Sequence, residues 1–200
     1  MGLDITAYSR LKHVGHCPDV DEEDHAYDPE TYAARHVRAY AYDSFPHALA
    51  GVPDVRTFSG RDGTTFLDGG CYAVTPETLT HSFRAGSYGG YNVWRADLAE
   101  QFNPYGPRTL EHGRGLDGKG YQTAPSAAGP FYELIWFADN EGTLSAQVAA
   151  KLLGQFRTHR ATYVSRAGRG SPENDYDIQR YDDWTRACEL AADGGLIDFH

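Results

Sequence analysis

Residues 174–199, NDYDIQRYDDWTRACELAADGGLIDF, hold the two patterns that decide the fold class. In the first part, apolar residues recur every three or four positions, as they do on a helix with one buried face. This stripe consists of Ile178, Tyr181, Trp184, Cys188 and Ala191. Gly194-Gly195 ends the helix, and the apolar run Leu196–Phe199 then predicts a closing strand. The segment therefore predicts a fold that mixes helices with a sheet.

The same helical period appears at two earlier places in the chain. Ser145–Arg160 carries apolar residues at every fourth position, namely Val148, Leu152 and Phe156. Tyr91–Phe102 carries a similar stripe of Tyr91, Trp94, Leu98 and Phe102. We therefore expect three principal helices, at Tyr91–Phe102, Ser145–Arg160 and Asp175–Ala192.

Strands are predicted where short runs alternate apolar and polar residues, as in Leu3–Tyr8. Further strands are expected at Val37–Tyr42, Thr64–Leu67, Cys71–Val74 and Leu196–Phe199. The very apolar run Phe131–Ala138 fits a strand or a buried helix, and Thr75-Pro76-Glu77 fits the start of a short helix. The sequence thus predicts an α/β (mixed α+β) fold, one domain over residues 1–200 with a sheet of about four to six short strands.

Three segments lack a period and are rich in glycine or polar residues, so we expect long loops there. They are His13–Glu30, Gly86–Gly90 and Asn103–Pro130. Loops as long as the last one are uncommon in compact domains and are often functional or disordered.

The chain has 28 acidic and 18 basic residues, a formal net charge of −10. This charge repels phosphate backbones, so we expect no binding of extended nucleic acid. A small anion stays possible, because a local group of backbone N–H donors can bind one. No apolar run approaches the roughly 20 residues of a membrane span, so we expect no membrane association. The sequence leaves the oligomeric state open.

The cysteines are Cys17, Cys71 and Cys188, an odd number of residues far apart in the chain. This spacing argues against a disulfide framework and for a reducing compartment. The N-terminal residues also lack the features of a secretory signal. We therefore expect a cytoplasmic protein.

The segment around Gly86–Gly90 is the leading candidate for a binding site. Glycines before a helix leave backbone N–H groups free at the positive end of the helix dipole, where an anion binds. Flanking arginines would add charge, and an aromatic ring would stack a base. The predicted ligand-binding residues are Arg84, Ser87, Tyr88, Gly89, Gly90 and Arg95. In the alternative interpretation the loop is structural, with Tyr91 and Trp94 packed in the core.

A second candidate is Asp139 with Glu141, two carboxylates between an apolar run and a helix. Such a pair can act as acid and base, or bind a divalent cation together with Asn140. An ordinary turn, with Thr143 or Ser145 capping the next helix, explains the same residues and is favoured.

A third candidate is a zinc site at His13, His16 and Cys17, residue types that coordinate zinc. No second pair of such residues follows at the spacing of a structural zinc site, so we expect no bound metal. The sequence also contains no recognised cofactor-binding or hydrolase motif, and we expect no cofactor.

Four segments resemble a group of uncharacterised phage and prophage proteins. They are Met1–Ser9, Ser87–Asn92, Phe137–Gly142 and Ala191–Gly195. The resemblance spans most of the chain and implies an accessory phage protein acting in the cytoplasm of a bacterial host. It brings no fold, activity or site residue with it. Small acidic phage proteins of that kind often counter host defences, by sequestering a nucleotide signal or by binding a defence protein.

Three hypotheses about function follow. The leading one is non-catalytic binding, or sequestration, of a small nucleotide-like ligand at the Gly86–Gly90 segment. The first alternative is a metal-dependent hydrolase of phosphate esters that uses Asp139 and Glu141. The second alternative is an inhibitor of protein interactions whose acidic surface covers a basic partner.

Overall fold

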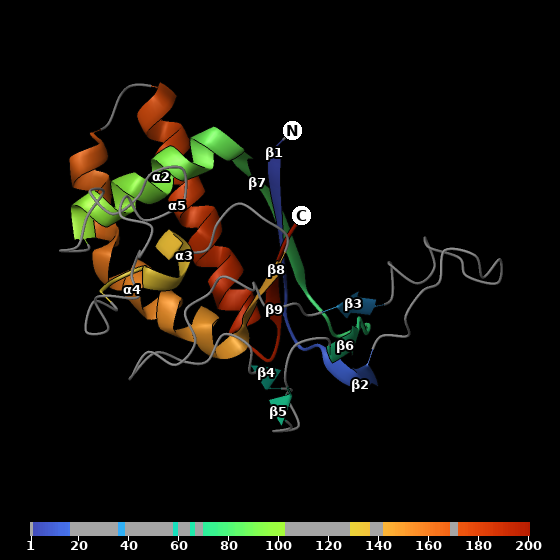
Figure 1. Ribbon diagram of the computed structural model, residues 1–200. Helices are drawn as coiled ribbons and strands as arrows, with labels where there is room; N and C mark the ends of the chain where they lie inside the picture. Colours follow the sequence, from blue (N-terminus) through green and yellow to red (C-terminus); the bar gives the residue numbers. More distant parts are fainter. Residues whose placement is uncertain are drawn as a thin grey trace, which may run out of the picture.

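The mixed α+β fold predicted from the sequence is confirmed. The structure is a computed structural model. It describes residues 2–16, 36–38, 58–59, 65–66, 70–102, 129–136, 142–168 and 172–200. In these ranges, four helices lie on one side of a four-stranded antiparallel sheet, and two smaller sheets lie near its lower end in Figure 1.

The main sheet has the strand order β7-β1-β9-β8, with every neighbouring pair antiparallel. Its strands are β7 (Thr80–Ser87), β1 (Gly2–Tyr8), β9 (Leu196–Phe199) and β8 (Gly142–Ser145). The central strand β1 has the alternation seen in its sequence. Leu3, Ile5 and Ala7 belong to the core, whereas Asp4 and Thr6 belong to the other face, where Thr6 pairs with Ser82 and Asp198.

The long helices lie where the sequence predicts them, with shifted ends. They are α2 (Tyr88–Phe102), α4 (Ala146–Ala167) and α5 (Pro172–Ala191), and a short α3 (Tyr132–Trp136) precedes β8. Ser145 caps α4, since its hydroxyl accepts a hydrogen bond from the N–H of Val148. The sequence of the apolar run Phe131–Ala138 fits either a strand or a buried helix, and the structure places the helix α3 within it.

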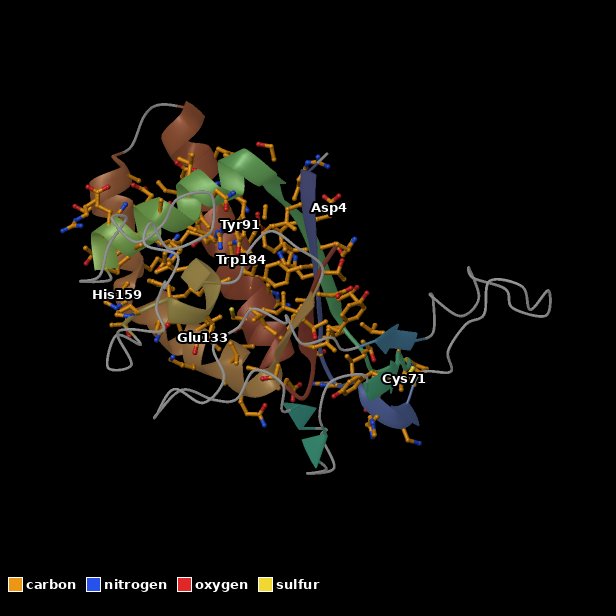
Figure 2. The ribbon with its side chains drawn as sticks, in the orientation of Figure 1. Asp4, Cys71, Tyr91, Glu133, His159 and Trp184 are labelled. Atoms are coloured by element: carbon orange, nitrogen blue, oxygen red, sulfur yellow. The ribbon has the colours of Figure 1, made fainter. Side chains whose placement is uncertain are left out.

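The core between helices and sheet is built on aromatic rings. Trp94 and Trp184 lie nearly parallel, with ring centroids 6.0 Å apart, and Tyr91 stacks beside both. Figure 2 shows Tyr91 and Trp184 in the layer between the helices and the sheet. The Trp94 indole N–H donates a hydrogen bond to the Tyr163 hydroxyl, whereas the Trp184 indole nitrogen is buried with no hydrogen-bond partner among the described residues. The prediction that Tyr91 and Trp94 are core residues is confirmed.

The smaller sheets come from the first half of the chain. One has the order β2-β6-β3, from Lys12–His16, Gly70–Ala73 and His36–Arg38. The other pairs β4 (Phe58–Ser59) with β5 (Thr65–Phe66). Strands β3, β5 and β6 lie within one residue of predicted strands, although residues 39–42 lie outside the described ranges.

Two local predictions are wrong. Residues 13–16 form strand β2 with Lys12 rather than the start of a loop, because they pair with β6. Thr75-Pro76-Glu77 forms a turn rather than a helix. The Thr78 N–H donates to the Thr75 carbonyl, and the Thr75 N–H donates to the Thr78 hydroxyl. These bonds close the chain on itself and direct it into β7.

The cysteine spacing argues against a disulfide framework, but Cys71 is disulfide-bonded. Cys71 lies in β6, opposite Gly15 of β2 and Arg38 of β3, whereas Cys188 is free and buried in α5. The bond removes one argument for a reducing compartment, so a cytoplasmic location stays a prediction. Among the described helices, none has the length and apolar character needed to cross a membrane.

Candidate functional site at the start of helix α2

Strand β7 passes directly into α2, so the prediction that Gly86–Gly90 forms a loop is wrong. Gly86 and Ser87 end the strand, and residues 88–90 form the first helical turn. The cause is a cap: the Gly90 N–H donates to the Ser87 hydroxyl over 3.1 Å. A serine in this position satisfies one of the free donors of the helix start.

The three glycines of the segment differ in what they do. Gly86 has a φ of +129°, a conformation that side chains disfavour, and it turns the chain into α2. A Cβ at Gly90 would lie 3.2 Å from the capping Ser87 oxygen. A Cβ at Gly89 would meet no atom within 4 Å, and Gly89 is exposed. The N–H end of α2 therefore opens to solvent at Gly89.

Arg84 lies on the sheet face that points away from the helices. Its guanidinium is 3.5 Å from the Asp4 carboxylate, its side chain is 58% exposed, and it extends over Gly2. Figure 2 shows Asp4 on the side of β1 away from the helices. Gly2 of β1 pairs with Ser87, the residue that caps α2. Because the Arg84 guanidinium lies over Gly2, its charge is one strand away from that cap.

Arg95 lies in the interior, away from the exposed first turn. Its side chain is 1% exposed and donates to the Ile135 carbonyl over 3.0 Å and to the Asn92 side-chain oxygen. Its guanidinium also stacks over the Tyr91 ring at 5.0 Å. The structure therefore assigns Arg95 to joining α2 with α3.

A residue that sequence reasoning missed, Arg180 of α5, lies against the start of α2. It donates to the Gly90 carbonyl over 3.3 Å, and its outer nitrogen is 3.5 Å from the position of a Cβ on Gly86. Its side chain is 6% exposed. Its Nε is buried and has no hydrogen-bond partner within the described parts of the chain. A largely buried cation thus adjoins this helix start.

An exposed aromatic ring completes the arrangement. The Arg180 guanidinium lies 4.6 Å from the centre of the Tyr176 ring, and Tyr176 is 48% exposed. The predicted aromatic residue of the site, Tyr88, is the first residue of α2, and the structure does not describe its side chain. Among the residues whose side chains the structure describes, Tyr176 therefore provides an exposed aromatic ring next to Arg180.

The charges at this point are unusual for a helix start. The N-terminus of a helix carries a partial positive charge, which acidic side chains commonly offset. The first turn of α2 has no acidic residue, and Arg180 adds a full positive charge. The carboxylate of Asp177 lies 3.7 Å from Arg180 and is 40% exposed. An additional anion bound here would relieve the remaining positive potential.

The other predicted sites are described only in part. Asp139, Glu141 and Cys17 lie outside the described ranges, so the hydrolase and zinc hypotheses stay predictions. His13 lies in β2, with its ring edge-on to Tyr72 at 5.6 Å. The described residues contain no cluster of three or more potential metal ligands of the His, Cys, Asp and Glu types.

Comparisons with protein-family models, curated proteins and solved structures find no match for this chain.

Proposed function

We propose that this protein binds and holds a small anionic, nucleotide-like ligand at the start of α2, without converting it. The observation that carries the proposal is Arg180, a nearly buried cation placed beside the positive end of α2. Placing two positive charges together costs free energy, and a bound anion offsets that cost. An anionic ligand therefore gives this arrangement a physical reason.

The phosphate of the ligand would approach Gly89, where the helix start is exposed and no side chain is present. The free N–H groups of the first turn are suitable donors for phosphate oxygens. Arg180 supplies charge from α5, and Arg84 supplies charge from the neighbouring edge of the sheet. Ser87 holds the turn in place through its bond to Gly90.

The base of the ligand would stack on Tyr176. This ring is half exposed, and its position is fixed by the Arg180 guanidinium packed against it. Stacking of a base on an aromatic ring contributes about 1–3 kcal/mol and depends little on which base it is. We therefore propose a nucleotide or a similar compound that combines a planar ring with a phosphate.

Binding without turnover is proposed because the described residues at this site offer hydrogen-bond donors, charge and an aromatic surface. Neither a nucleophile paired with a base nor a group of metal ligands appears among them. The resemblance to phage proteins extends the proposal: in a bacterial host, such a ligand would be a nucleotide signal that the protein sequesters.

A nucleotide panel tests this function. Purified protein is mixed with mononucleotides, cyclic nucleotides and dinucleotides, and binding is measured by calorimetry. The released ligand is then analysed by chromatography. We expect at least one nucleotide to bind and to be recovered intact. An altered product would favour the hydrolase, and no binding across the panel would contradict the proposal.

Two variants locate the site in the same experiment. Tyr176→Ala should weaken binding by about 1–3 kcal/mol because the stacking surface is lost. Arg84→Ala should weaken it more modestly, because an exposed charge contributes little at a distance. Arg186→Ala, which removes an exposed cation elsewhere on α5, is the control and should bind like wild type.

A further inference from the structure

A second surface feature lies at the other end of β1 and β7 from the start of α2. It is a cavity of about 550 Å³ between the turn that follows β1 and the turn that precedes β7. Its walls include Arg10, Leu11, Lys12 and His13 on one side and Pro76 and Glu77 on the other. This volume falls in the range of small-molecule sites, which are typically about 300–1,000 Å³.

The wall of the cavity at Arg10 is held in a fixed position. The Arg10 N–H donates to the Asp193 carbonyl over 2.8 Å, and the Leu11 N–H donates to the Gly194 carbonyl over 3.0 Å. Ser9 is bonded in turn to Leu79, next to β7. These contacts tie the turn to the end of α5 and to β7, so the wall exists before any ligand arrives.

Arg10 also has a φ of +52°, in the left-handed region that residues other than glycine seldom adopt. Such a conformation is strained and persists only where surrounding contacts impose it. Residues held in this way are concentrated at ligand-binding sites. The backbone of Arg10 is thus a second, independent indication that this cavity is functional.

The cavity combines an apolar surface with charge. The apolar surface comes from Pro76, which is exposed in the second turn, whereas Leu11 is 1% exposed and anchors the first turn in a small core with Val37, Tyr72 and Leu196. The Arg10 guanidinium is held by the Asp193 carboxylate at 2.7 Å. Lys12 is exposed and has no ion pair within the described parts of the chain. A cation is therefore available above an apolar surface.

We propose that this cavity binds a small amphiphilic anion, a molecule with an apolar ring or chain and one carboxylate, sulfonate or phosphate group. The apolar part packs on the exposed ring of Pro76, and the anionic group pairs with Lys12. Glu77, on the opposite wall, disfavours a second negative charge on the ligand. This site is separate from the start of α2, and its test does not depend on nucleotide binding.

The probe for the test is 8-anilinonaphthalene-1-sulfonate, which carries one sulfonate on an aromatic body. Its fluorescence on titration gives a Kd, and ¹H–¹⁵N NMR shift changes give its location. Wild-type protein should bind it with shift changes centred on residues 10–13 and 75–77. Shift changes centred elsewhere would overturn the proposal, as would the absence of binding.

Two substitutions should change the Kd in opposite directions. Lys12→Met removes the cation and should raise the Kd about three- to tenfold. Glu77→Gln removes the opposing charge and should lower it about twofold or more. Arg186→Met and Glu100→Gln make the same changes of net charge on α5 and α2, and they should leave the Kd unchanged. Equal effects of the cavity variants and their controls would overturn the proposal.

Discussion

The guanidinium of Arg180, in the third turn of α5, donates a hydrogen bond to the Gly90 carbonyl in the first turn of α2 over 3.3 Å. This contact joins two segments that lie 90 residues apart in the sequence. It also places a full positive charge, which has the Asp177 carboxylate at 3.7 Å, at the positive end of a helix, where a cation is unfavourable. The proposed ligand site rests on this relationship.

The two arginines predicted for the site should behave differently when they are removed. Arg95→Met deletes a buried cation bonded to Ile135, and we expect a loss of about 2–3 kcal/mol in the free energy of unfolding. Arg84→Met removes a largely exposed ion pair and should change stability by less than about 0.5 kcal/mol. Urea denaturation measures both, and equal effects would contradict the two placements.

Two glycines provide a matched pair for stability. A Cβ at Gly195 would overlap the Tyr8 carbonyl oxygen and lie 2.9 Å from the Ser9 Cα, whereas a Cβ at Gly154 meets no atom within 4 Å. Gly195→Ala should therefore destabilise by about 3 kcal/mol or more, because backbone must move. Gly154→Ala should stabilise by about 0.5–1 kcal/mol, because alanine favours the helix. Thermal unfolding with either sign reversed would contradict this packing.

Glu133 and Lys151 form a pair whose two members should be unequal when removed. The Glu133 carboxylate is fully buried and lies 2.6 Å from the Lys151 ammonium group, which is 23% exposed. Lys151→Met should cost about 2–4 kcal/mol because it leaves a buried charge without its partner. Adding Glu133→Gln should recover part of that loss. A double-mutant cycle in urea measures the coupling, and a coupling near zero would show that the pair is unimportant.

The stability of the protein should depend on pH through His159. This imidazole packs against Phe102 and Phe131, and burial lowers its pKa below the ordinary value of 6.5. Because protonation is harder in the folded state, the contribution is fully present above pH 6.5 and is lost as pH falls through the folded pKa. Unfolding free energies at pH 7.5 and pH 5 should therefore differ less in His159→Gln than in wild type. An unchanged difference would exclude this role.

The periodic elements could be predicted because burial imposes a pattern on them. The stripe from Ile178 to Ala191 follows from one buried face of α5. The apolar run Leu196–Phe199 follows from β9, whose residues Leu196, Ile197 and Phe199 are all buried. Strand β7 was missed because Thr80, Ser82 and Arg84 face solvent and few of its residues are buried. Its sequence therefore carries a weak signal, and the preceding Thr-Pro-Glu resembles a helix start.

Only some residues of the proposed site carry a signal in the sequence. The glycines at 86, 89 and 90 predict a loop, and they do not reveal that Ser87 caps a helix that begins at residue 88 or that, of the three, only Gly89 is exposed. Arg180 carried no visible signal, because a charged residue within a helix normally faces water. Its role depends on how α5 crosses α2, which is a matter of tertiary packing. For the same reason Arg95, close to the glycines in sequence, lies on the buried side.

The most direct test of the proposed site uses Gly89, whose substitution adds atoms only where the ligand would lie. Calorimetric titration with the tightest-binding nucleotide of the panel is compared for wild type, Gly89→Val and Gly154→Val. The last is an equivalent exposed glycine on α4 and controls for the effect of valine in a helix. We predict that Gly89→Val weakens binding at least about tenfold, while Gly154→Val binds like wild type. Equal affinity of the folded Gly89→Val and wild-type proteins would contradict a ligand site at the start of α2.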